Sequence, residues 1–121
     1  MNPVKVVQPV GIIDGTQVDQ LHQQIDAAVD TGASIILIDL QDVSFMDSSG
    51  LGALVIALKK VRAIGKRLCV CSLNQQLQIL FEVASMDLIF EIYKDQDEFQ
   101  ETLLAIAASW PLNRLLAVVA G

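Results

Sequence analysis

Residues 42–52 read DVSFMDSSGLG, in which positions 47–52 place an aspartate, two serines and two glycines between an apolar run and a helical pattern. Side chains of these types can do three kinds of chemistry. A serine can act as a nucleophile, a glycine-rich loop can hold a phosphate group, or a serine can itself receive a phosphate. The spacing of the neighbouring residues distinguishes among these three.

A nucleophilic serine at a strand-to-helix turn needs glycine two positions before it and two positions after it. Met46 stands two positions before Ser48, and Asp47 two positions before Ser49. A dinucleotide fingerprint would need a third glycine where Val55 stands, and a phosphate loop would need Gly-Lys followed by Ser or Thr, which the chain lacks. We therefore expect no enzyme, no catalytic residues and no bound cofactor, and only nucleotide binding by another geometry stays open.

Two cysteines and one histidine are the other candidates for chemistry. Cys69 and Cys71 alternate in LCVCSL, a short apolar run of strand type, so we expect free, buried thiols. His22 lies at the margin of an apolar helical stripe, where a boundary residue is expected. A metal site would need further ligands that this chain hardly offers.

Composition and charge limit the class of protein. With 53% hydrophobic and 18% charged residues, a chain of 121 residues is expected to fold as one domain around one core. A net charge of −6 disfavours a nucleic-acid partner. The main basic cluster complements the end of a predicted helix and contains Lys59, Lys60, Arg62, Lys66 and Arg67. The first residues, MNPVKVVQPVG, do not resemble a signal peptide, so we expect a cytoplasmic protein that is not bound to a membrane.

Hydrophobic spacing alternates between strand and helix patterns along the chain. Contiguous apolar or β-branched residues predict strands over 4–13, 35–40, 68–73 and 90–93. Apolar residues at intervals of three and four predict helices over 16–32, 51–65, 75–85 and 95–108. This alternation predicts an α/β domain with parallel strands, and Pro9 places the first strand near an edge or a bulge.

The predicted topology brings distant residues together. Parallel strands end at one edge of a sheet, where the loops into the helices collect. Asp14 follows the first predicted strand, whereas Asp47, Ser48 and Ser49 follow the second. We expect all four residues to share one surface, although Asp14 can also simply begin a turn.

Ser48 has two interpretations that local chemistry leaves open. As the N-cap of the second helix, its hydroxyl can accept hydrogen bonds from amides near Gly50 and Leu51. The same amides and the positive end of the helix can instead hold a phosphate on Ser48, while Gly50 and Gly52 leave its approach free.

Residues 45–52, FMDSSGLG, resemble the signature of the STAS domain family, especially the anti-sigma factor antagonists of bacterial sporulation and stress responses. The resemblance extends over residues 4–107 through GIID at 11–14 and through IILIDL, CVCSL and LFEVASMDLIFEIY. It implies a STAS domain over residues 1–108, with a mostly parallel mixed sheet of about four strands and helices packed against it.

The resemblance also implies a function. Ser48 would be phosphorylated by a cognate anti-sigma factor serine kinase, the unphosphorylated protein would bind this kinase and free the sigma factor, and a PP2C-type phosphatase would reset the cycle. Asp14 would contact the kinase, beside the loop from Asp47 through Ser49 and Gly50 to Leu51.

Two further expectations accompany this function. We add Met46 and Leu51 as apolar contacts with the kinase. The alternative is a non-enzymatic STAS sensory or scaffold module that binds a nucleotide or another regulator through the same edge, without phosphorylation of Ser48.

The sequence departs from the family at both ends. Family members commonly begin with an extra N-terminal strand, whereas here the pattern starts at Val4 and leaves an edge whose cover is not evident. Residues 109–121, SWPLNRLLAVVAG, form an apolar tail with helical spacing that is too short to span a membrane. This tail either packs on its own domain or joins two chains in a homodimer.

Overall fold

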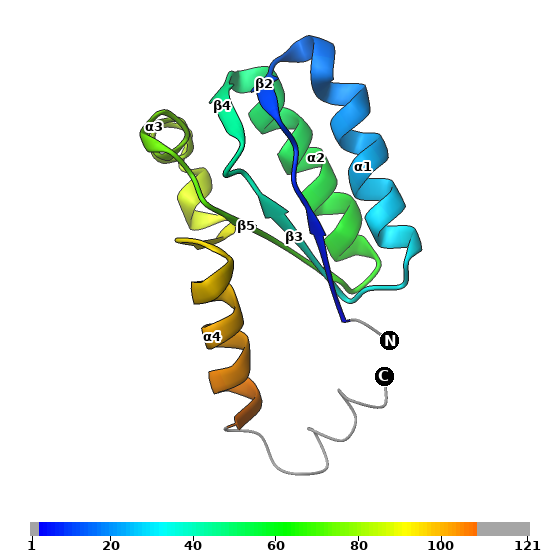
Figure 1. Ribbon diagram of the computed structural model, residues 1–121. Coiled ribbons are helices and arrows are strands. Elements are labelled where there is room, and N and C mark those ends of the chain that lie inside the picture. The colour runs from blue at the N-terminus through cyan, green and yellow to red at the C-terminus, as the bar shows by residue number, and fades with distance from the viewer. Residues whose placement is uncertain (1–2, 109–121) are drawn as a thin grey trace.

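The computed structural model describes residues 3–108 and contains a four-stranded parallel sheet (Figure 1). Its strands, in the order β1-β3-β5-β6, are β1 (Val4–Val7), β3 (Ile35–Asp39), β5 (Arg67–Cys71) and β6 (Glu91–Tyr93). Every neighbouring pair in this sheet is parallel. Parallel neighbours need helical crossovers, supplied by α1 (Val18–Asp30), α2 (Ser48–Ala63) and α3 (Gln75–Val83). The predicted α/β class is therefore confirmed.

Two strands of this sheet continue into a separate two-stranded ladder. β2 (Gly11–Ile13) follows β1, β4 (Val43–Met46) follows β3, and the two pair in parallel, as Figure 1 shows. We call this pair the ribbon. A shift of register between Gly11 and Ile12, shortly after Pro9, interrupts the ladder. Because residues 8–10 separate β1 from β2, the prediction of one strand over residues 4–13 was wrong, and the loop predicted after the second strand contains β4.

The main sheet is covered on both faces. On β3, Ile36 and Ile38 belong to the larger core, which includes residues of α1, α2 and α3. Ile35 and Leu37 belong to a smaller core with Phe99 of α4 (Gln96–Ala108). This alternation explains the uninterrupted apolar run of β3, because a strand buried on both faces has no polar side. Figure 1 shows α1 and α2 side by side, with α4 apart from them.

The ends of the helices follow the sequence signals. Gly32 and Gly65 close the first two helical segments with φ values of +83° and +76°, which glycine adopts without strain. Lys60 and Arg62 lie in the last turn of α2, where positive charge favours the helix end. The helix-end interpretation of the basic cluster is thereby confirmed for these two residues, whereas Arg67 lies in β5.

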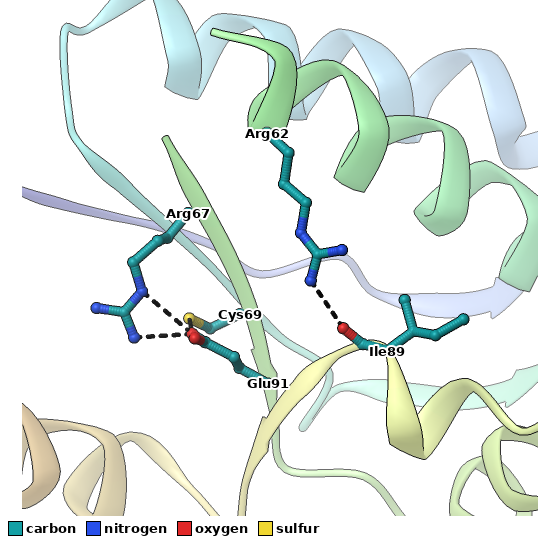
Figure 2. Close-up of polar contacts among 5 residues, drawn as sticks. All are labelled: Arg62, Arg67, Cys69, Ile89 and Glu91. Carbon is teal, nitrogen blue, oxygen red and sulfur yellow. Dashed lines mark hydrogen bonds and ion pairs between the residues drawn. The ribbon is translucent and has the colours of Figure 1, made fainter. Parts of the chain in front are cut away.

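A thiol, a carboxylate and a guanidinium meet where β5 pairs with β6 (Figure 2). The Cys69 thiol donates to Glu91 Oε2 over 2.8 Å, and Arg67 forms an ion pair with the same oxygen at 2.8 Å. Arg62 reaches from α2 and donates to the Ile89 carbonyl at 2.9 Å. Cys69 and Cys71 are free and buried, as expected from the sequence. Burial, reinforced by Glu91, raises the pKa of Cys69 to about 12.

The predicted apolar tail over residues 109–121, and the homodimer expected from it, lie outside the described residues. Within residues 3–108, no helix is both long enough and apolar enough to cross a membrane.

The first turn of α2 packs closely against the ribbon. A methyl group at Gly50 would stand 2.5 Å from the Ile13 carbonyl oxygen and 2.8 Å from the Met46 side chain. Gly52, two residues further along α2, has open space at the same point. Gly50 is therefore required by packing, whereas Gly52 is not.

We expect Gly50→Ala to lower the free energy of unfolding by about 1–3 kcal/mol, because the added methyl group must displace backbone. Gly52→Ala is the matched control and should raise that free energy by about 0.5–1 kcal/mol through helix propensity. Urea denaturation measures both. Equal stability of the two variants would contradict the close approach of α2 to the ribbon.

The Cys69 thiol should make stability depend on alkaline pH. Its folded pKa of about 12 exceeds the ordinary value of 9.0, so its contribution to stability is complete below pH 9 and is lost as the pH rises toward 12. The free-energy difference between the wild type and Cys69→Ala should therefore shrink between pH 9 and pH 11. Urea denaturation across this range tests it, and a constant difference would contradict it.

Candidate functional site

Asp14 and Asp47 lie beside each other at the carboxyl end of the ribbon. Ile13 pairs with Met46 in the β2–β4 register, and the residue that follows each strand is an aspartate. The Asp47 amide donates to the Ile13 carbonyl over 3.3 Å, so the contact between the two chain segments continues one residue beyond the end of β4. The structure thus brings together two loops that are far apart in the sequence.

Asp14 organises the turn that follows β2. Its Oδ1 accepts hydrogen bonds from the Thr16 hydroxyl at 2.6 Å and from the Thr16 amide at 2.9 Å. These bonds, the hydroxyl first, lower the pKa of Asp14, so the side chain is ionised at neutral pH. The turn role considered for Asp14 is therefore present, and the partly exposed carboxylate still carries its charge at the surface.

Asp47, not Ser48, is the N-cap of α2. Its backbone is extended, with φ −103° and ψ −175°, and its Oδ1 accepts from the Ser49 amide at 2.9 Å and the Gly50 amide at 3.0 Å. Ser48 is already the first helical residue. The predicted capping role of Ser48 was wrong because aspartate caps a helix as well as serine and stands one position earlier, where the backbone is still extended.

The Ser48 side chain is consequently left without a structural task. It is exposed, and its hydroxyl makes no hydrogen bond to any residue in the range 3–108. Ser49 is also exposed, and a methyl group at Gly15 would lie 3.8 Å from the Ser49 hydroxyl. The turn after β2 therefore adjoins the first turn of α2. We call Asp14, Asp47, Ser48 and Ser49 the ribbon tip.

Three residues that we expected at a contact surface lie inside the domain. Met46 is 0% exposed and Leu51 is 5% exposed, and both belong to the larger core. Gly50 is also buried, beneath the close contact with Ile13. This corrects the expectation for these residues. Met46 and Leu51 support the ribbon tip from within the core, and the missing side chain of Gly50 allows α2 to pack closely against Ile13.

α3 holds the outer edge of β4 through two side chains that the sequence analysis did not select. The Gln76 amide group donates to the Met46 carbonyl at 2.8 Å and accepts from the Met46 amide at 3.0 Å. Asn74 donates to the carbonyls of Val43 and Ser44 at 3.1 and 3.2 Å. These residues position the strand that leads into Asp47. No local sequence pattern indicates their role, because it depends on where α3 packs.

Two exposed apolar residues also escaped the sequence analysis. Ile12 is 55% exposed and Phe45 is 44% exposed, and the two are partners in the ribbon register. Their neighbours Ile13 and Met46 are buried, so the outer face of the ribbon is apolar. Strict alternation along VSFM does not reveal this face, because Val43 and Met46 are buried while the adjacent Ser44 and Phe45 are both exposed, at the register shift of the ribbon.

The residues considered for metal binding or base catalysis lie elsewhere. His22 Nε2 donates to the Ala53 carbonyl at 3.1 Å and links α1 to α2, as befits a boundary residue. Within residues 3–108, no group of three His, Cys, Asp or Glu side chains is arranged to hold a metal ion.

Comparison with known proteins finds a family model, the STAS domain, that matches residues 2–99. The anti-sigma-B factor antagonist of Listeria monocytogenes is 32% identical over 88 residues, which cover 73% of this chain and 77% of that protein. The crystal structure of an anti-sigma factor antagonist from Mycobacterium paratuberculosis has a TM-score of 0.75 at 25% identity, covering 84% of this chain and 86% of that one. The Bacillus cell fate determinant SpoIIAA in its phosphorylated form has a TM-score of 0.62 at 19% identity, covering 84% and 93% of the two chains.

The solved structures share the fold of this chain, and the family model spans the main sheet, the ribbon and its tip. The chain therefore belongs to the STAS domain family.

Proposed function

We propose that this protein is an anti-sigma factor antagonist. It binds an anti-sigma factor serine kinase while Ser48 is unmodified, and it releases this kinase once Ser48 has been phosphorylated. A PP2C-type phosphatase restores the binding form. The observation that carries the proposal is the Ser48 hydroxyl, which is exposed at the first residue of α2 and makes no hydrogen bond within residues 3–108.

The similar proteins support this proposal. The Listeria monocytogenes relative is an anti-sigma-B factor antagonist, and SpoIIAA, whose fold this chain shares, has been solved in a phosphorylated form. An acceptor serine must reach into the site of another enzyme, and Ser48 is exposed at the first residue of α2. In this scheme the chain is the substrate of the kinase and needs no catalytic base of its own.

A phosphate on Ser48 would change the charge of the ribbon tip more than its fold. It adds a charge of about −1.5 to −2 at neutral pH. The positive end of α2 favours this charge by only about 0.3–1 kcal/mol, and Asp47 already occupies two first-turn amides of α2. Asp47 and Asp14 repel the phosphate as well. The folded state should therefore persist, with a strongly negative group facing outward.

The same charge has a larger effect within an interface. A buried phosphate without cations to match it loses its hydration, which costs several kcal/mol. Every 1.4 kcal/mol, approximately, corresponds to a factor of ten in affinity. After transfer, the phosphate would also face the nucleotide phosphates that remain in the kinase. Modification of one hydroxyl can thus separate the two proteins without refolding either.

The modification site is tested by incubation with ATP and the anti-sigma factor serine kinase of the same organism, followed by intact mass measurement. The wild type should gain one phosphate, Ser48→Ala should gain none, and Ser49→Ala should gain one as the matched control. Ser48→Asp should bind the kinase at least about tenfold more weakly than the wild type, at an unchanged melting temperature. Phosphorylation of Ser48→Ala would refute the assignment.

Asp14 should contribute to binding through its charge. In Asp14→Asn an oxygen remains to accept the bonds from Thr16, so the melting temperature should stay within about 2 °C of the wild type. Affinity for the kinase should fall about fivefold, because a charge at the interface is lost. Asp14→Ala, which also removes the acceptor, should melt at a lower temperature. If Asp14→Asn loses stability but keeps its affinity, Asp14 has the turn role alone.

A further inference from the structure

The outer face of the ribbon carries an apolar pair next to the ribbon tip. Ile12 and Phe45 are register partners, and 55% and 44% of their surfaces are exposed. Register partners on adjacent strands point to the same face, so the two side chains form one patch. Ile12 precedes Asp14 by two residues and Phe45 precedes Ser48 by three, which places this patch beside the acceptor serine.

Within residues 3–108, the helices that neighbour the ribbon do not cover its outer face. Asn74 and Gln76 of α3 bond to backbone atoms along the edge of β4 and not to its outer side chains. The helices α1 and α2 pack on the opposite side of the ribbon, where Ile13 and Met46 join the larger core. The exposed pair is therefore a surface feature and not a gap in the packing of the domain.

The segment of the chain that contains this patch carries formal charges of one sign. No lysine or arginine occurs between Lys5 and Lys59, and the same stretch contains seven aspartates. It includes the whole ribbon, the ribbon tip, α1 and the first half of α2. Asp42 stands immediately before β4, and Asp14 and Asp47 stand at the opposite end of the ribbon. An apolar pair flanked by carboxylates at both ends complements an apolar pocket rimmed by lysine and arginine.

We propose that Ile12 and Phe45 are the apolar centre of the surface that docks the anti-sigma factor, whose complementary surface is an apolar pocket with a basic rim. The inference rests on the proposed function and adds which side chains provide affinity and what chemistry the partner presents. Aromatic and aliphatic side chains buried at the centre of an interface commonly carry most of the binding energy, while rim charges guide the encounter.

Titration calorimetry with the purified anti-sigma factor serine kinase tests the patch. Phe45→Ala and Ile12→Ala should each bind at least about tenfold more weakly than the wild type, with melting temperatures close to it. The matched control is Ile64→Ala, since Ile64 is 56% exposed and follows the far end of α2. It should bind as tightly as the wild type.

The outcomes separate the two proposals. If Phe45→Ala and Ile12→Ala bind like the wild type while Ser48→Asp does not bind, the apolar docking surface is wrong and the proposed function stands. If the unmodified wild type does not bind the kinase, the proposed function fails and this surface fails with it. Equal weakening by Ile64→Ala would also overturn the patch, because the effect would not be local.

Salt dependence tests the basic rim. Affinity of the wild type should decrease as ionic strength rises, since exposed charge pairs are screened at a Debye length of about 10 Å in 0.1 M salt. Asp42→Asn should weaken binding at low salt and reduce the salt dependence, whereas Asp97→Asn on α4 should change neither. An affinity that is independent of salt would overturn the charge complementarity.

Discussion

The Ile13 carbonyl is the point on which the geometry of the ribbon tip depends. It accepts the Asp47 amide at 3.3 Å, and it is also the atom that a methyl group at Gly50 would approach to 2.5 Å. One backbone oxygen thereby joins β2 to the end of β4 and sets how closely α2 can begin beside both strands. Because Asp14 directly follows Ile13, the last residue of β2, the same oxygen also fixes the distance between the two loops of the tip.

Structure and chemistry are assigned to different residues at this tip. Asp47 satisfies the amides of Ser49 and Gly50, and Met46 beneath it is fully buried. Ser48 therefore neither caps α2 nor packs in the core. A side chain with no structural task can be modified at little cost to the fold, which is what a reversible covalent switch requires. The cap also places a negative charge beside Ser48, so the phosphate that we propose there would act mainly outside the domain.

The sequence was sufficient for the fold class, because the helices repeat their apolar residues at three and four positions and β3 is apolar throughout. The ribbon was not predictable in the same way. Residues 4–13 look like one strand, but residues 8–10, which include Pro9, separate β1 from β2. The four residues VSFM are too short to be distinguished from a loop. The FMDSSGLG segment indicated the site, but spacing alone could not decide which of Asp47 and Ser48 caps the helix, nor that Met46 faces inward.

The way α3 closes the ribbon determines which backbone groups of β4 stay available to another chain. A strand at the border of a ladder offers a row of backbone donors and acceptors that can template another chain. Along β4 these groups are taken by the side chains of Asn74 and Gln76, which end the ladder instead of extending it. Gln76, which bonds the Met46 amide and carbonyl as a neighbouring strand would, thus protects this edge of β4 against pairing with another strand, and it does so with a side chain instead of a further strand.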